Sequence, residues 1–228
     1  MDMTPEHWRG SQAYLDEVFG DADDEHLRTL MPRAVAAGLP DIAVSPSVAR
    51  FVGLLAHLAT HHPRSTGRVL EVGTLAGYSG IHLARNLRPG ATLTTIEFEP
   101  KHAAFARAAF DAAGVGARVD IVVGAALDVL PRLARAFGDG SLDMVFLDAT
   151  KVEYPRYLDL VTPMLRPGGI LAADNILGSH WWITDPPGSS PERDAMDRFN
   201  RGLATSGHFQ SAGVFAEHGI VIGLRTDK

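Results

Sequence analysis

Three oxygen-bearing side chains occupy two places where the chain could hold a metal ion. Asp148 follows the apolar run 144–147, and Asp174 and Asn175 follow a second apolar run, 170–173. Carboxylates and an amide carbonyl are hard oxygen donors, which suit Mg²⁺ or another divalent cation such as Ca²⁺ or Mn²⁺ rather than zinc. If the two runs are neighbouring strands, these side chains converge beyond the sheet edge. A metal ion bound there to a substrate hydroxyl would lower the pKa of that hydroxyl.

Lys151 lies three residues after Asp148 and completes this group. A metal ion and burial would both depress the pKa of the lysine, so Lys151 could accept the proton of a substrate hydroxyl. Each residue alone has a simpler interpretation, because acids often cap helices, Asp-Asn pairs form turns and a lysine can pair with an acid at the surface. The four residues together favour a site.

A glycine turn and a later acid indicate a nucleoside ligand. Gly73 would let a ligand approach the backbone closely, and Gly77 would permit a tight entry into a helix. Glu97 ends the next predicted strand, where a carboxylate can accept hydrogen bonds from both ribose hydroxyls; a solvated acid beside Glu99 is the alternative. The turn lacks the third glycine of a dinucleotide fingerprint. A single nucleoside, above all S-adenosylmethionine, is therefore favoured over NAD.

Small residues follow the third predicted strand, at Gly124, Ala125 and Ala126. They would let an adenine ring lie flat against the backbone, although this pattern alone carries little information.

Hydrophobic periodicity predicts the elements that position these residues. Three helices open the chain, at 7–19, 24–37 and 47–60, and from Gly67 short β-rich runs alternate with helical stretches. The predicted strands are 68–72, 92–97, 118–123, 142–147, 169–173, 208–215 and 220–224, with a hairpin turn at 217–219. Such alternation predicts a mostly parallel sheet with helices on both faces. The segment 178–191 is irregular and contains Trp181 and Trp182, which favours an active-site loop.

Composition limits the functional classes. The 228 residues suit one α/β domain, and the net charge of −6 argues against binding to nucleic acid or to an anionic membrane, because both require a basic face. The absence of cysteine excludes disulfides and thiolate metal sites. The N-terminus has no signal-peptide pattern and no apolar run is long enough to span a bilayer, so we expect a cytoplasmic protein.

These motifs together resemble the metal-dependent, catechol-type O-methyltransferases, which include the mammalian catechol enzyme, the plant caffeoyl-coenzyme A enzymes and many bacterial relatives. The resemblance runs from about Asp41 to Asn175. It rests on 69–79, Glu97, Gly124-Ala125, Asp148 with Lys151, Tyr154 and Tyr157, 166–169 and Asp174-Asn175, in the order of the family.

The resemblance implies a fold and a set of roles. The fold would be α/β, a Rossmann-like class I methyltransferase with a seven-stranded, mostly parallel sheet and a C-terminal antiparallel hairpin. Residues 1–228 would form a single domain, with a helical preface at 1–60 and the core at 67–228. The cofactor site would be lined by Val44, Glu71, Gly73, Tyr78, Ser79, Glu97, Ala125 and Asp148. Asp148, Asp174 and Asn175 would bind the metal, Lys151 would be the base with Asp148 beside the sulfonium, and a homodimer would form.

Three departures from the family concern the substrate rather than the cofactor. Family members often carry an acid at the position of Thr150, a Gly-x-Val segment after Asn175 and a Gly-Asp-Gly hairpin turn. The expected substrate is a small aromatic hydroxyl compound, and His180, Trp181 and Trp182 are the residues expected to contact it. The alternatives are a methyltransferase for a modified tRNA base, a metal-independent small-molecule methyltransferase and a non-catalytic nucleoside-binding protein.

Overall fold

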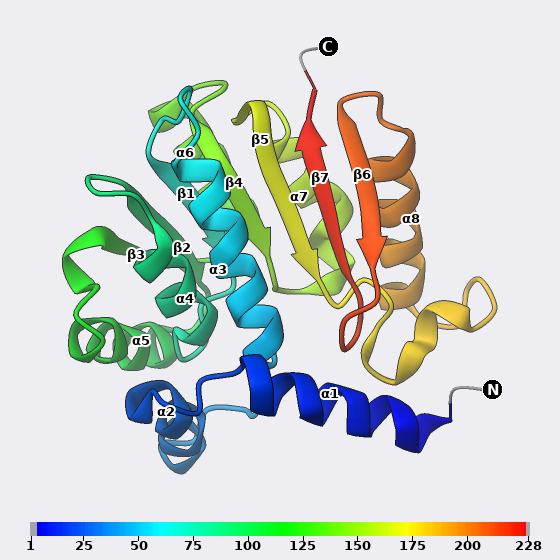
Figure 1. Ribbon diagram of the computed structural model, residues 1–228. Helices are drawn as coiled ribbons and strands as arrows, with labels where there is room; N and C mark the ends of the chain where they lie inside the picture. Colours follow the sequence, from blue (N-terminus) through cyan, green and yellow to red (C-terminus); the bar gives the residue numbers. More distant parts are fainter. Residues whose placement is uncertain (1–3, 227–228) are drawn as a thin grey trace.

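The computed structural model describes residues 4–226, apart from the side chains of Pro5, His180 and Trp181. Seven strands form one sheet in the order β3-β2-β1-β4-β5-β7-β6 (Figure 1). The first five strands are parallel, whereas β7 is antiparallel to β5 and β6 is antiparallel to β7. The strands are β1 (Arg68–Val72), β2 (Thr92–Glu97), β3 (Val119–Val123), β4 (Leu142–Leu147), β5 (Leu165–Asp174), β6 (Phe209–Val214) and β7 (Ile220–Arg225). The predicted mostly parallel sheet with a C-terminal hairpin is confirmed.

Helices cover both faces of the sheet. They are α1 (Pro5–Phe19), α2 (Glu25–Ala36), α3 (Pro46–Thr60), α4 (Tyr78–Asn86), α5 (Pro100–Ala112), α6 (Ala126–Phe137), α7 (Tyr154–Val161) and α8 (Pro191–Thr205). Side chains alternate across each strand, so Val69 packs with α3 and α4 on one face while Leu70 packs with α6, α7 and α8 on the other. The first three helices begin and end within two residues of their predicted bounds.

The N-terminal helices lie at a functionally important edge. Figure 1 shows α1 and α2 below the end of the sheet at which β1 to β5 finish. The order of the strands reverses between β1 and β4, and ligands of open α/β sheets bind at such a point, beyond the carboxyl ends of the strands. The helical preface therefore lies beside the expected ligand site.

Two segments differ from their predicted form. The fifth strand begins at Leu165 rather than at Gly169, because a register shift between Leu142 and Met144 lets β4 pair with this earlier residue. The irregular segment before α8 contains a 3₁₀ helix, η3 (Ser179–Thr184). The hairpin turn lies where it was predicted, with Glu217 and Gly219 both at positive φ.

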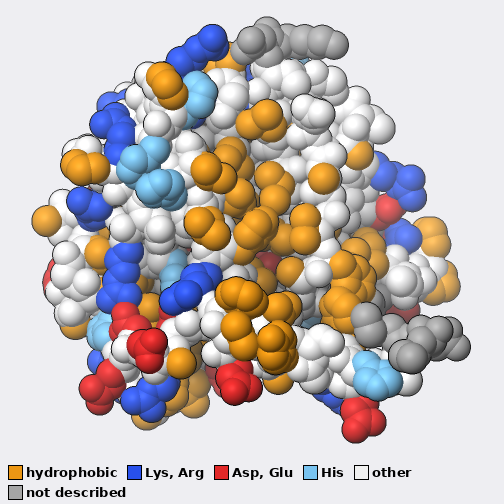
Figure 2. All heavy atoms as spheres, in the orientation of Figure 1, with side chains coloured by type: hydrophobic (Ala, Val, Ile, Leu, Met, Phe, Trp, Pro, Cys, Tyr) orange, Lys and Arg blue, Asp and Glu red, His pale blue; other side chains and the backbone are white. Residues whose placement is uncertain are grey.

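One face of the molecule keeps apolar side chains at its surface. Leu54 and Leu58 of α3 are 58% and 63% exposed, and Leu224 of β7 is 44% exposed. Figure 2 shows hydrophobic side chains gathered at the centre of this face. The homodimer implied by the family resemblance stays a prediction. Within residues 4–226, no helix is both long and apolar enough to cross a membrane.

Candidate functional site

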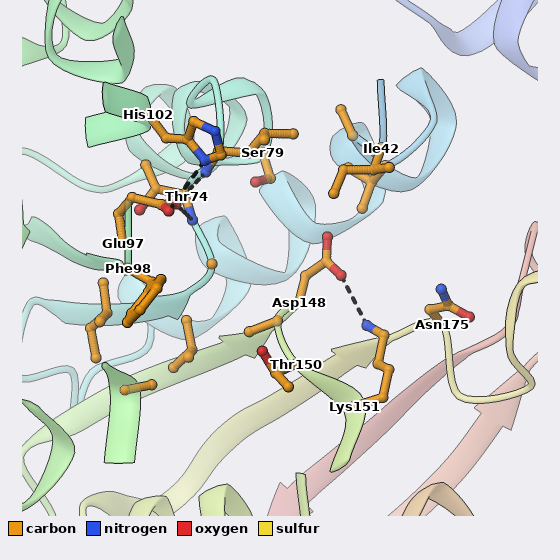
Figure 3. Close-up of a pocket in the computed structure, with 18 of the residues that line it drawn as sticks. Ile42, Thr74, Ser79, Glu97, Phe98, His102, Asp148, Thr150, Lys151 and Asn175 are labelled. Carbon is orange, nitrogen blue, oxygen red and sulfur yellow. Dashed lines mark hydrogen bonds and ion pairs between the residues drawn. The ribbon is translucent and has the colours of Figure 1, made fainter. Parts of the chain in front are cut away.

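A cavity of about 650 Å³ opens at the carboxyl ends of the central strands (Figure 3). Its walls come from the residues that follow β1, β2, β3 and β4, together with the segment 40–44 before α3. The sheet order places these ends side by side, although Val72 of β1 and its paired residue Leu147 of β4 are 75 residues apart in sequence. The predicted sites at the glycine turn, Glu97, Ala125 and Asp148 therefore share one cavity.

Packing within the protein requires glycine at both positions of the glycine turn. Gly73 has φ +101°, and a Cβ atom placed on it would lie 1.9 Å from the backbone oxygen of Asp148. A side chain at this position would thus collide with the end of β4. Gly77 has φ +86° and faces the ring of Phe110 on α5. Both glycines are required for the strand ends and helices around the cavity to pack closely.

Glu97 joins the second strand to the glycine turn. Its Oε2 accepts hydrogen bonds from the backbone N–H groups of Thr74 (3.2 Å) and Leu75 (2.8 Å), and its Oε1 accepts from the N–H of Glu99. The Nδ1 atom of His102 lies 3.4 Å from Oε1. Figure 3 shows this group on one side of the cavity. The carboxylate is thus held rigidly at the wall, where it can bind ribose hydroxyl groups.

The other predicted cofactor contacts are divided between the wall and the layer behind it. Val44, Tyr78, Ser79 and Ala125 line the cavity. Glu71, which the resemblance places in the cofactor site, is not a lining residue: it is fully buried, and it accepts hydrogen bonds from the hydroxyls of Ser79 (2.6 Å) and Thr95 (2.7 Å). Burial raises the pKa of Glu71 to about 7 despite these two hydrogen bonds. Its place in the structure is to hold Ser79 at the wall.

Lys151 is fixed at the junction of β4 and β5. Its Nζ donates to Asp148 Oδ1 (3.1 Å), to the hydroxyl of Tyr154 (2.6 Å) and to the backbone oxygen of Asp174 (3.3 Å). The dashed line in Figure 3 marks the contact with Asp148. These three acceptors favour the protonated form of Lys151, and they hold its amino group beside the predicted metal ligands.

The neighbours of Lys151 reverse the expected direction of its pKa shift. Burial lowers the pKa of Lys151, but the interactions with Tyr154 and Asp148 outweigh burial and hold the pKa above its ordinary value. The lowered pKa predicted from the sequence is therefore not a property of the chain alone. It would require the positive charge of a bound metal ion, as the prediction had assumed.

The predicted metal ligands carry oxygen atoms that lack protein partners. Oδ1 of Asp174 and Oδ1 of Asn175 are buried, and neither has a hydrogen-bond partner among the described residues. Burial, and then the charge of Asp148, raise the pKa of Asp174 to about 8. Asn175 also has φ +58°, which is uncommon outside glycine. Buried unpaired oxygens are costly, so this arrangement fits a cation that would pair with them.

The donor set has a mixed composition. The predicted ligands are two carboxylates, Asp148 and Asp174, and one amide, Asn175. Within residues 4–226, no group of three or more His, Cys, Asp or Glu side chains is placed to hold a metal ion. Two carboxylates and an amide oxygen match the preferences of Mg²⁺ rather than those of zinc. The residues present thus fit a hard divalent cation.

The predicted substrate contacts after β5 are placed differently. Trp182 packs against the second core cluster, and its indole lies over Gly178, where a Cβ atom would come within 2.0 Å of the ring. It does not line the cavity. This placement favours a packing role for Trp182 rather than the expected contact with substrate. The side chains of His180 and Trp181 lie outside the described part of the structure.

Several cavity residues were not singled out from the sequence. Phe98 and Ile42 line the cavity and are 65% and 69% exposed, and Glu153 also belongs to its wall. Phe98 could have been found, because it directly follows Glu97. Tyr154 matched the family pattern without an assigned role, and its hydroxyl proves to be the partner of Lys151.

Comparisons with known proteins agree with this geometry. A family described as O-methyltransferase matches residues 17–226. A catechol O-methyltransferase of Niastella koreensis is 38% identical over 193 residues, covering 85% of this chain and 84% of that protein. A catechol O-methyltransferase of Mycobacterium tuberculosis is 41% identical over 165 residues, covering 72% and 70%.

Two solved structures have the same fold. An O-methyltransferase from Bacillus cereus in complex with SAH superposes with a TM-score of 0.85 at 28% identity, covering 97% of this chain and 99% of that one. An O-methyltransferase from Streptomyces achromogenes, involved in tomaymycin synthesis and in complex with SAM, gives 0.84 at 33% identity, covering 99% and 100%. With the family match spanning nearly the whole chain, this protein belongs to the O-methyltransferase family.

Proposed function

We propose that the protein transfers the methyl group of S-adenosylmethionine (SAM) to a hydroxyl of a small catechol-like or other phenolic molecule, with the help of a divalent cation, preferably Mg²⁺. Support for the cofactor comes from the cavity around Glu97 and from the related structures in complex with SAH and SAM. Support for the substrate class comes from the relatives named catechol O-methyltransferase.

One observation carries the metal-dependent part of the proposal. Asp148, at the end of β4, and Asp174 and Asn175, at the end of β5, converge beside Lys151, and buried oxygens of the last two lack protein partners. The strands are hydrogen-bonded neighbours, with Leu147 paired to Ala173. This pairing brings the ends of the two strands together, and Asp148 and Asn175 line the cavity there.

The chain would perform the reaction mainly by positioning and electrostatics. A divalent cation held by Asp148, Asp174 and Asn175 would supply Lewis acidity to an acceptor hydroxyl. Glu97 would fix the ribose and so orient the sulfonium toward the acceptor. The hydroxyl oxygen would form a bond to the methyl carbon while the carbon–sulfur bond breaks, which releases S-adenosylhomocysteine (SAH). Lys151, held at Asp148, would take the hydroxyl proton once its own proton has been lost.

Chelation tests the proposal. We expect EDTA to abolish methylation of a catechol panel and Mg²⁺ to restore it. In calorimetry, the Asp174→Asn variant should bind Mg²⁺ much more weakly than the wild type and still bind SAH. A matched control is Asp185→Asn, an exposed acid after η3, which should leave Mg²⁺ binding intact. Full turnover in EDTA would instead favour a metal-independent methyltransferase, and methylation of tRNA rather than catechols would favour the nucleic-acid alternative.

A further inference from the structure

One end of the cavity has the surface properties of a slot for a flat ring. Beyond Glu97 the wall is formed by Gly124, Ala125 and Ala126, whose side chains offer no hydrogen-bonding group. Phe98, which also lines the cavity, is 65% exposed. Figure 3 shows Phe98 beside Glu97, on the side of the cavity away from Lys151 and Asn175. An aromatic side chain with this much free surface can stack on a planar ligand.

Glu153 also lines this cavity and carries a charged acceptor. It closes the 3₁₀ helix η2 (Lys151–Glu153) and precedes α7, whose residues pack with those of α6 in one core cluster. A 3₁₀ helix has three residues per turn, so residues two positions apart lie on different sides of it. Lys151 and Glu153 therefore project in different directions. Because Lys151 points toward the end of β5, Glu153 is free to serve a different part of the cavity.

The carboxylate of Glu153 is held in place from one side. The buried Tyr157, which is 1% exposed, donates its hydroxyl hydrogen to Oε2 of Glu153 in a very short hydrogen bond. Both residues line the cavity. Among the described residues, no side chain donates to the second oxygen, Oε1. A fixed carboxylate with one free oxygen recognises a hydrogen-bond donor on a ligand.

From this arrangement we propose that Glu153 recognises the adenine ring of the cofactor by accepting a hydrogen bond from its exocyclic amino group, with Phe98 stacked on the ring and Tyr157 positioning the carboxylate. The inference rests on the proposed function for its ligand. With the ribose on Glu97 and the methyl group directed at Asp148, the base must extend toward the residues after β3. Among the acids of the wall, both oxygens of Glu97 accept backbone hydrogen bonds and Asp148 belongs to the proposed metal site, which leaves Glu153 to accept from the base.

A change of the purine 6-substituent isolates this contact. SAH carries an amino group, which donates a hydrogen bond, whereas S-inosylhomocysteine carries an oxo group, whose lone pairs would face the carboxylate. A site built around a donor rejects an analogue that lacks it. We expect calorimetry to show that the wild type binds SAH at least about tenfold more tightly than S-inosylhomocysteine, since a hydrogen bond to a charged group has roughly this worth.

The variants separate the contact from general effects on binding. Glu153→Ala should reduce the preference to less than about threefold, and Tyr157→Phe should reduce it partly, because the carboxylate loses its positioning partner. Glu97→Ala should weaken both ligands and leave their ratio unchanged. Asp128→Asn, a carboxylate in the first turn of α6 that does not line the cavity, is the control for charge and should change neither affinity.

The outcomes distinguish this inference from the function on which it rests. A wild type that binds no SAH would contradict the proposed function and the inference together. A wild type that binds SAH, with a preference unchanged in both Glu153→Ala and Tyr157→Phe, would overturn the inference alone. Thermal melts of each variant show that it is folded, and Tyr157→Phe provides the test if Glu153→Ala does not fold.

Discussion

The amino nitrogen of Lys151 lies 2.6 Å from the hydroxyl oxygen of Tyr154, which is completely buried beneath it. The same hydroxyl lies 3.1 Å from the backbone oxygen of Leu147 and 3.3 Å from that of Asp174. One phenol group thus connects the ends of β4 and β5 with the proposed base. This geometry makes Tyr154 a positioning residue for Lys151.

Removing this hydroxyl should affect both stability and turnover. We expect Tyr154→Phe to lower the free energy of unfolding by about 1–3 kcal/mol, because the backbone oxygens of Leu147 and Asp174 and the amine of Lys151 each lose a buried hydrogen bond. It should lower kcat while the dissociation constant of SAH stays constant. Denaturant unfolding and steady-state kinetics measure the two effects. Tyr14→Phe, at an exposed position of α1, should show neither. A stable variant with unchanged kcat would mean that Lys151 needs no such support.

Replacing the lysine itself should abolish most of the catalysis. Lys151→Ala should reduce kcat by roughly a hundredfold or more, the usual worth of a positioned base. Lys151→Arg should not restore the rate, because a guanidinium does not release its proton near neutral pH. Kinetics at several pH values with an acidic catechol provide the check. If Lys151→Ala keeps its rate at high pH, solvent accepts the proton and Lys151 only orients the acceptor.

The raised pKa of Asp174 predicts an opposition between stability and function. Its pKa of about 8 lies above the ordinary value of an aspartate, so the folded state holds a proton that the unfolded chain releases, and stability falls as pH rises from about 4 to 8. In metal-free protein, Asp174→Asn should therefore be stabilising, by more at pH 8 than at pH 5 and by at least about 1.4 kcal/mol, the equivalent of one pKa unit. Unfolding curves at both pH values measure this difference.

Mg²⁺ binding should be coupled to the loss of the same proton from Asp174. Because the ionised carboxylate is the metal ligand, affinity should rise with pH up to about 8 and then level off. Calorimetry in buffers of different ionisation enthalpy would detect the released proton. An affinity independent of pH between 6 and 8 would contradict the raised pKa.

Glu97 should govern cofactor affinity. Glu97→Ala removes both the proposed ribose acceptor and the partner of the Thr74 and Leu75 amides, so the dissociation constant of SAH should rise about tenfold or more. Calorimetry measures the change. Glu99→Ala, an exposed acid two residues away that does not line the cavity, is the control and should bind SAH normally. An unchanged dissociation constant for Glu97→Ala would mean that Glu97 does not bind the ribose.

The sequence by itself determined the order of the elements and the edge at which the chemistry is placed. Alternation of apolar runs at strand and helix spacing is a local property, so the first three helices and the hairpin turn were predicted closely. Acids that end parallel strands necessarily lie at one sheet edge, which is why Glu97, Asp148 and Asp174 could be assigned to a common site before their contacts were known.

Only the tertiary structure decided which of these side chains face the cavity and which support it. Glu71 and Ser79 belong to the same predicted motif, yet Glu71 is buried because Thr95 of the neighbouring strand and Ser79 enclose its carboxylate. The roles of Tyr154 and Trp182 likewise depend on β5 and on the loop that follows it. Such partners lie far away along the chain, and their contacts arise from packing between elements, which local residue patterns do not encode.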